Sequence, residues 1–129
     1  MQIDLPEVLA EVRAAFDRYE RALVSNDVAT LKEMFHVDQR TIRYGATENL
    51  YGAKEIEAFR TARPSVGLSR TLSKTVITTF GHDFAMASTL FHRQSAPNMV
   101  GRQTQTWVRF DGDWRVVVGH VSLISEAAT

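Results

Sequence analysis

The segment from Gly101 to Ile124 constrains the fold of this chain more than any other, because it consists of two β-rich runs on either side of an Asp-Gly turn. Asp111-Gly112 supplies the positive φ angles that a tight hairpin turn requires. A two-residue loop at this turn pairs Gln103 with His120, and side chains alternate between the faces of a strand. One face then carries Gln103, Gln105, Trp107, Val116, Val118, His120 and Ser122. That face is apolar near the turn and polar at its far end, which is typical of the wall of a small-molecule pocket.

The register of this hairpin stays open at the level of sequence. If the loop instead spans the three residues Asp111–Asp113, the pairing slips by one position, and Arg102 joins His120 and Ser122 in place of the two glutamines. A slip of one residue exchanges the two faces of a strand. The loop length therefore decides which side chains face the pocket.

The composition indicates a single domain and excludes several kinds of site. A chain of 129 residues, taken as one domain over residues 1–129, is long enough to bury a core. Fifteen basic and fifteen acidic residues balance, so no overall field favours nucleic acid or an acidic membrane surface. Without cysteine there is no disulfide, thiolate nucleophile or cysteine-ligated metal. The histidines show no metal-ligand spacing with acids, so we expect no metal and no cofactor.

The sequence also carries no targeting signal that we can identify. No apolar stretch approaches the roughly 20 residues of a membrane span, and the N-terminus lacks the apolar core of a signal peptide. The expected location is therefore the cytoplasm, with no membrane partner. Between Arg40 and Arg115 arginines far outnumber lysines, and arginine is suited to a two-pronged grip on carboxylates. This imbalance indicates a small anionic ligand, and the alternative for each single arginine is a weak ion pair at the surface.

The first sixty residues show helical periodicity. Apolar residues recur at three- and four-residue spacing over Leu5–Leu23, which predicts a long amphipathic helix with Asp4 as its N-cap. Asp27 is placed to cap a short second helix. A third helix is expected over Ala53–Ala62.

The remaining segments favour strands. One strand is expected at Gln39–Tyr44, followed by a loop at Gly45–Gly52. Four long runs rich in Val, Thr, Ile and Phe then predict an antiparallel meander over Arg70–Phe80, His82–Gln94, Arg102–Phe110 and Trp114–Ile124. Strands longer than the usual five or six residues indicate strong curvature. The expected fold class is α+β, with a curved sheet wrapped around the first helix.

The second face of the closing hairpin is also largely apolar, and it carries Thr104, Thr106, Val108, Val117, Val121 and Leu123. A sheet packed on a helix normally exposes polar residues on its other side. A second apolar face therefore predicts a homo-oligomer, built as a homodimer or as a dimer of dimers.

Several stretches of the chain resemble one known group of proteins. They are Arg18-Tyr19-Glu20, Thr41-Ile42-Arg43-Tyr44-Gly45, Phe59-Arg60 with Arg63-Pro64, and the Gly101–Ile124 hairpin. Together they resemble the NTF2-like superfamily, which includes SnoaL-like cyclases and ketosteroid isomerase, and within it the AtzH-like family, also seen as HpxZ-type oxalurate-catabolism proteins. The resemblance implies an NTF2-like cone, in which a curved antiparallel sheet wraps around three N-terminal helices. A shared fold does not by itself carry an activity.

The resemblance also implies a reaction and a setting. The family looks like accessory enzymes that act beside an amidase and its small subunit in nitrogen-compound breakdown, including that of cyanuric acid. The implied reaction converts 1,3-dicarboxyurea to allophanate, a decarboxylating amidohydrolase step on a linear C–N bond. Tyr19 and Arg43 stand at the positions of the family's proposed catalytic tyrosine and arginine.

The chemistry of these two residues allows more than one role. Tyr19 lies in the apolar stripe of the first helix, so its phenol either bonds a core carbonyl or donates a proton to a leaving nitrogen. A buried Arg43 needs a protein carboxylate, for which Glu20 and Glu48 are available, or an anionic ligand. We expect the ligand.

Further residues are expected to line the substrate site. Arg60 and Arg63 share one helical face near the cone mouth, where they would attract an anion, and His120 can bind a carboxylate as its cation. The full set of expected substrate-binding residues is His120, Ser122, Gln103, Gln105, Trp107, Arg60 and Arg63.

One absence separates the possible functions. Proton abstraction of the steroid-isomerase kind needs a carboxylate base in the pocket, yet between Arg60 and Phe110 the only acid is Asp83, at a turn. The leading hypothesis is an enzyme acting on a small anionic ureido substrate, with Tyr19 as acid and Arg43 as anion clamp. The alternative is a non-catalytic protein that binds an anion or accompanies an amidase complex.

Overall fold

The computed structural model describes residues 1–128, within which the chain forms three α-helices and six strands. The helices are α1 (Pro6–Ser25), α2 (Val28–Met34) and α3 (Ala53–Ala62), and a 3-10 turn, Glu126–Ala128, follows the last strand. The strands are β1 (Ile42–Tyr44), β2 (Asn49–Tyr51), β3 (Thr71–Phe80), β4 (Phe84–His92), β5 (Met99–Phe110) and β6 (Asp113–Ser125). Among the described residues, no helix combines the length and apolarity needed to cross a membrane.

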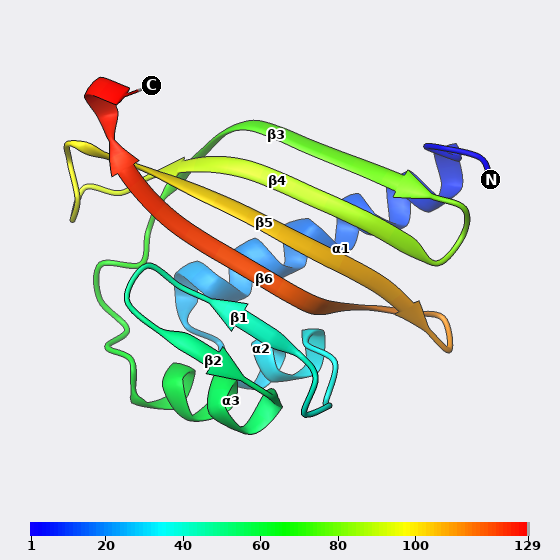
Figure 1. Cartoon of the computed structure of the whole chain (residues 1–129), viewed down its shortest axis with the longest axis horizontal. Coiled ribbons are helices and arrows are strands. Elements are labelled where there is room, and N and C mark those ends of the chain that lie inside the picture. The colour runs from blue at the N-terminus through cyan, green and yellow to red at the C-terminus, as the bar shows by residue number, and fades with distance from the viewer. Residues whose placement is uncertain (129) are drawn as a thin grey trace.

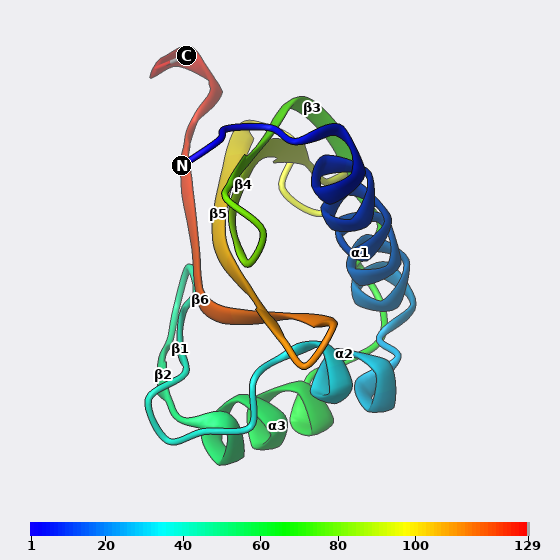
Figure 2. The same cartoon turned by 90° about the vertical axis from the view of Figure 1, so that its right-hand side faces the viewer.

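The six strands form one curved sheet in the order β2-β1-β6-β5-β4-β3 (Figure 1). Strands β3 to β6 form the predicted antiparallel meander, whereas β1 runs parallel to β6 and antiparallel to β2. The sheet curls around α1 without closing, and α2 and α3 lie together at one end of the hollow (Figure 2). This arrangement confirms the α+β cone.

The apolar stripe of α1 forms the centre of the core. Val12, Phe16 and Tyr19 are at most 2% exposed, and they belong to one buried cluster with Trp107 and Val116 of the inner sheet face. Full burial of a large apolar side chain contributes about 1.5–3 kcal/mol. The helix is therefore held in the hollow mainly by this stripe.

The two predicted helix caps have different outcomes. Asp27 caps α2, since its carboxylate accepts a hydrogen bond from the backbone N–H of Thr30 at 3.2 Å. Asp4 does not cap α1, because the N-cap residue is Leu5. The Asp4 carboxylate instead accepts a hydrogen bond from the backbone N–H of Thr79 at 2.9 Å. It holds the N-terminal segment against β3 and leaves the first turn of the helix without a side-chain cap.

The region between α2 and α3 differs from the prediction at both of its expected elements. The strand expected from Gln39 begins only at Ile42, because Asp38 and Arg40 form a turn in which the carboxylate accepts the Arg40 backbone N–H. The expected loop Gly45–Gly52 contains β2, which pairs with β1. Three-residue strands are too short for alternation to be recognised in a sequence.

The hairpin of β5 and β6 begins with the two-residue turn. Trp107 pairs with Val116, and Asp111 and Gly112 have φ angles of 50° and 86°. Farther from the turn the register shifts between Thr106 and Trp107, since a β-bulge inserts one extra residue into β6. The pairing beyond the bulge is therefore the one that a three-residue loop would give.

The bulge exchanges the two faces of β6 over its second half. His120 and Ser122 pair with Thr104 and Arg102 on the outer face, so the prediction that they line the pocket is wrong. Val121 and Leu123, expected on the outer face, move to the inner face by the same shift. The glutamines at 103 and 105 and Trp107 do face inward, and all three are buried. A bulge within a run of β-branched residues leaves no signature in the sequence.

Candidate functional site

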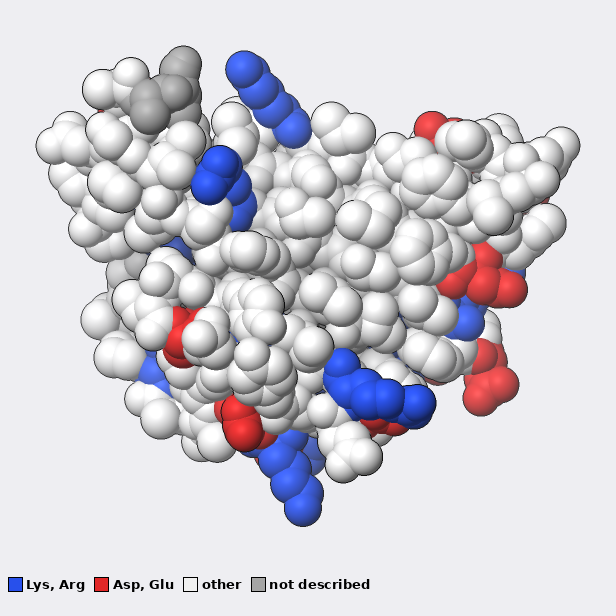
Figure 3. All heavy atoms as spheres, viewed as in Figure 1, with Lys and Arg blue, Asp and Glu red and all other residues white. Residues whose placement is uncertain are grey.

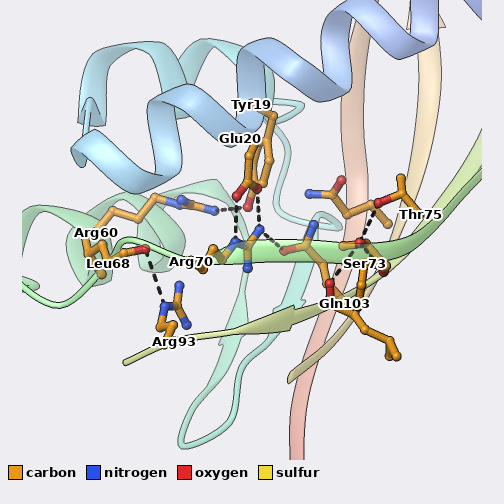
Figure 4. Close-up of polar contacts among 12 residues, drawn as sticks. Tyr19, Glu20, Arg60, Leu68, Arg70, Ser73, Thr75, Arg93 and Gln103 are labelled. Carbon is orange, nitrogen blue, oxygen red and sulfur yellow. Dashed lines mark hydrogen bonds and ion pairs between the residues drawn. The ribbon is translucent and has the colours of Figure 1, made fainter. Parts of the chain in front are cut away.

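Tyr19 lies at the centre of the cone, where α1 faces the sheet. Its side chain is 2% exposed, and its ring makes an edge contact with Trp107 at 6.2 Å between centroids and a tilted one with Phe35 at 6.0 Å. The Nη2 of Arg60 donates a hydrogen bond to the phenol oxygen at 3.3 Å (Figure 4). The helical stripe thus places Tyr19 in the core, as predicted, and gives it a charged partner.

The arginines around Tyr19 change its acidity. Burial alone would raise the pKa of Tyr19, but the positive charges of Arg60, Arg43 and Arg70 outweigh that effect. The pKa is lowered from its ordinary value of 10 to about 8. A phenol with this pKa remains largely protonated at neutral pH and gives up its proton more readily than a free tyrosine does.

Arg60 is buried rather than exposed at the cone mouth. It lies in the last turn of α3, is 1% exposed, and its guanidinium sits 4.9 Å from the centre of the Phe35 ring. Its Nε and Nη1 are buried, and among the described residues neither has a hydrogen-bond partner. A cation buried this deeply with unused donors is costly unless an acceptor reaches it.

Arg63 does not share a helical face with Arg60, because α3 ends at Ala62 and Arg63 is its extended C-cap. Its Nη2 donates to Oδ1 of Asn26 at 3.0 Å, while its buried Nε has no partner in the described chain. Burial, and then the charges of Arg60 and Arg43, lower the pKa of Arg63 to about 10. The three guanidiniums are therefore close enough to repel one another.

Arg43 lies on the inner face of β1, where it pairs with Gly119 of β6. Its side chain is 9% exposed, and its Nη1 donates to Oε1 of Glu48 at 2.8 Å. The guanidinium also lies 5.5 Å from the centre of the Phe59 ring. Of the two carboxylates that the sequence offers as partners of Arg43, Glu48 is the one that bonds it.

The sequence interpretation missed a second buried ion pair. Arg70 precedes β3, its side chain is 1% exposed, and it grips Glu20 with two hydrogen bonds of 2.6 and 2.9 Å. The same Nη2 reaches Oε1 of Gln103 at 2.9 Å (Figure 4). The only signal for this pair was the position of Glu20 next to Tyr19, one step around the helix.

Arg93, which follows β4, lies near Arg70, because both guanidiniums are over the Phe91 ring. The cluster formed by Arg43, Arg60, Arg63, Arg70 and Arg93 has more positive charge and more donors than its surroundings can satisfy. Only Glu20 and Glu48 form ion pairs with these arginines in the described residues. The buried atoms without partners in this region are all donors, namely Nε and Nη1 of Arg60, Nε of Arg63 and Nε2 of Gln103. The arrangement suits a ligand that brings negative charge and several acceptor oxygens. No group of metal-binding side chains occurs within residues 1–128.

Two hollows reach members of this arginine cluster. One, of about 220 Å³, lies between α2 and α3 with mainly apolar walls, and Arg60 is among its lining residues. The other, of about 660 Å³, is an open groove lined by Arg70, Arg93 and His92. The cluster is thus approached from the helical end of the cone and from the segment between β4 and β5.

The remaining predicted site residues divide into two groups. Gln103 contacts the cluster through Arg70, whereas Gln105 accepts a hydrogen bond from the Trp107 indole at 3.2 Å and supports the ring beneath Tyr19. His120 and Ser122 lie on the outer face, away from the cluster. The structure therefore assembles Tyr19, Arg43, Arg60, Arg63 and Gln103, and adds Glu20, Glu48 and Arg70.

Comparisons with known proteins agree with this architecture. The model of the AtzH-like family matches residues 1–127. A protein of unknown function from Pectobacterium atrosepticum is 58% identical, with a TM-score of 0.93 over 95% of each chain. A cystatin-like fold protein from Burkholderia xenovorans is 44% identical, with a TM-score of 0.92 over 97% of this chain and 98% of that one. No curated protein matches the chain.

A more distant structure shares the fold alone. An NTF2-like protein of unknown function from Pseudomonas putida is 19% identical, with a TM-score of 0.75 over 90% of this chain and 86% of that one. The expected NTF2-like architecture is confirmed by this likeness, which carries no activity with it.

Proposed function

Because the chain belongs to the AtzH-like family, we propose that it is a small enzyme that removes a carboxyl group from the nitrogen of an N-carboxylated urea. The reaction implied by the family resemblance, 1,3-dicarboxyurea to allophanate, is the specific form of this proposal, within the breakdown of cyanuric acid and related nitrogen compounds. The observation that carries this proposal is the cluster around Tyr19, where a phenol of lowered pKa lies beside buried guanidinium donors that have no acceptors.

The proposed substrate class fits the surplus of positive charge and hydrogen-bond donors at the site. A dicarboxylated urea carries two negative charges and three groups with acceptor oxygens, while five arginines face only two glutamates in the cluster. Arginine binds planar carboxylates through paired N–H donors. The donors of Arg60 and Arg63 without partners would bind one carboxylate or the urea carbonyl, and Arg43 would take the other carboxylate.

The proposed step balances with a single proton. The C–N bond to the carboxyl group breaks, its electron pair stays on nitrogen, and the carboxyl group leaves as CO2. Nitrogen takes the proton of the Tyr19 hydroxyl, and water later returns a proton to the tyrosinate. A pKa of about 8 is close to neutral pH, which is the range in which a general acid transfers its proton efficiently. Arg60, already bonded to the phenol oxygen, stabilises the tyrosinate that forms.

The test is timed product analysis with the purified protein. Freshly prepared N-carboxylated ureas should yield CO2 and the decarboxylated urea faster with protein than in buffer. Arg43→Lys should keep the charge but lose the planar grip, and so raise KM about tenfold. Binding without turnover would overturn the proposal and favour the non-catalytic alternative. Ligand-induced stabilisation cannot separate the two, because both give it.

We also propose that the outer sheet face binds another copy of the chain, as a homodimer or a dimer of dimers. Large apolar side chains are exposed on this face, among them Val118, Phe84 and Tyr51. Figure 3, which views this side of the molecule, shows few charged side chains over the middle of the sheet. Light scattering should give at least twice the mass of one chain, and Val118→Asp should lower it. A monomeric wild-type protein would overturn this proposal.

A further inference from the structure

The carboxylate of Glu48 is bonded to the guanidinium of Arg43, which the proposed function assigns to a substrate carboxylate. Its Oε1 accepts the 2.8 Å hydrogen bond from Arg43, and its Oε2 accepts bonds from the hydroxyl and the backbone N–H of Thr47 at 2.7 and 3.2 Å. Burial alone would raise the pKa of Glu48, but these bonds from Thr47 and Arg43 lower it. The carboxylate therefore carries its charge at neutral pH.

Gly45 provides the room for this carboxylate. A Cβ atom at Gly45 would lie 1.7 Å from Oε1 of Glu48. The backbone of Gly45 is not in the positive-φ region, so its conformation does not itself require glycine. The absence of a side chain at this position allows Glu48 to fold back across the end of β1 and reach Arg43.

The Glu48–Arg43 pair is more readily replaced than the other ion pair of the cluster. Glu20 and Arg70 share two hydrogen bonds, with Gln103 as a third partner, and the Arg70 side chain is 1% exposed. Glu48 holds Arg43 by a single hydrogen bond, and the two side chains are 17% and 9% exposed.

Arg43 has a second support that does not depend on Glu48. Its guanidinium lies 5.5 Å from the centre of the Phe59 ring, within the range of a cation–π contact. If the Glu48 carboxylate moves away, the guanidinium therefore keeps its place on the inner face.

We propose that Glu48 is a resident carboxylate that an anionic ligand must displace from Arg43, and that it thereby determines which ligands enter the site. The proposal rests on the proposed function only in taking Arg43 as an anion contact. A ligand with its own carboxylate restores the lost ion pair, whereas a neutral ligand of the same shape leaves Arg43 buried without a counter-charge. Glu48 is in this sense a specificity-determining residue for carboxylated ligands.

The experiment compares the binding of malonate and of neutral malonamide by isothermal titration calorimetry. Glu48→Gln removes the competing charge and should lower the Kd for malonate about tenfold, the effect of one charge-assisted hydrogen bond. Gly45→Ala keeps the carboxylate but forces it off Arg43, so it should change the Kd in the same direction. Glu33→Gln is the control, because it removes an equal charge from a surface pair with Arg18. Malonamide has no carboxylate to take the place of Glu48 on Arg43, so its binding should stay weaker than that of malonate in every variant.

Each outcome of the calorimetry either supports or overturns the displacement of Glu48. Tighter malonate binding by both Glu48→Gln and Gly45→Ala, with Glu33→Gln unchanged, supports displacement. An unchanged or higher Kd in Glu48→Gln means that Glu48 positions Arg43 for the ligand and overturns the proposal, as does the absence of malonate binding in every variant. Turnover is judged separately. If the variants bind malonate more tightly but the protein does not decarboxylate N-carboxylated ureas, the proposed function is wrong and the displacement of Glu48 stands. If the protein decarboxylates them but the variants do not bind malonate more tightly, the proposed function stands and the displacement of Glu48 is wrong.

Discussion

Arg60 donates a hydrogen bond to the hydroxyl of Tyr19 at 3.3 Å, between side chains that are 1% and 2% exposed. The guanidinium is also within 6 Å of the ring centres of both Tyr19 and Phe35. With so little solvent, the charge of Arg60 is screened less than it would be at the protein surface. This contact makes Tyr19 the one tyrosine of the described chain whose pKa is shown to be lowered.

The first prediction concerns the ionisation of this tyrosine. Ultraviolet difference titration should detect one tyrosinate forming near pH 8 in the wild-type protein, below the ordinary range. Arg60→Met removes the nearest positive charge while keeping much of the volume, so the transition should move to higher pH. Tyr19→Phe should abolish it. Tyr51 will not interfere, because its hydrogen bond with Tyr44 raises its pKa. An unchanged midpoint in Arg60→Met would show that Arg43 and Arg70, and not Arg60, lower the pKa of this tyrosine.

The second prediction is a pH dependence of stability. Tyr19 has a lower pKa in the folded chain than in the unfolded one, so between about pH 8 and 10 the unfolded state binds more protons. Its contribution is absent below pH 8, grows through this interval and is complete above pH 10. Relative to Tyr19→Phe, the wild-type free energy of unfolding should rise by on the order of 2 kcal/mol between pH 7 and pH 10. Urea titrations at the two values measure it, and a fall would contradict the lowered pKa.

The third prediction separates chemistry from folding. Tyr19→Phe removes one hydroxyl from a core ring that still contacts Trp107 and Phe35. Circular dichroism should therefore show an unchanged fold. If the hydroxyl is the proton donor, turnover of an N-carboxylated urea should fall by 10²- to 10⁴-fold, roughly the contribution of general acid catalysis. A variant with wild-type rates would remove Tyr19 from the mechanism.

The sequence allowed the placement of Tyr19 and the overall cone to be predicted, because both depend on periodicity. A three- to four-residue apolar repeat sets which side of α1 is buried, and Tyr19 is part of that repeat. The four long strands were visible for the same reason, through their length and β-branched content. Arg43 was recognisable as an arginine in the middle of a strand, although its partner was one of two candidates.

The burial of Arg60 and of Arg70 was beyond such reasoning, since each violates the rule that arginine is exposed. Arg60 lies on the inner side of α3, and only the tertiary structure shows that Phe35 and Tyr19 surround it. Arg70 depends on Glu20, fifty positions earlier. The predicted position of His120 was wrong for a different reason. One extra residue in β6 inverts every side chain beyond it, and no local pattern marks where a bulge occurs.

The final prediction tests the packing that supports Arg70 and Arg93. Both guanidiniums lie over the Phe91 ring, at 4.5 and 4.9 Å from its centre, and Gly101 of β5 pairs with Phe91 across the sheet. A Cβ atom at Gly101 would lie 2.1 Å from the ring, which is 1% exposed. Gly101→Ala should therefore lower the free energy of unfolding by about 1–3 kcal/mol, the usual cost of overpacking.

The matched control for this substitution is Gly119→Ala on the neighbouring strand. Gly119 is also buried and free of positive φ, but a Cβ there meets Cγ of Arg43 at 3.6 Å, an ordinary contact. In a strand, alanine costs less backbone entropy than glycine, so this variant should be as stable as the wild type or slightly more so. Urea unfolding of both variants measures the difference. Equal stabilities would mean that the Phe91 ring moves aside freely, and that it does not hold Arg70 and Arg93 in place.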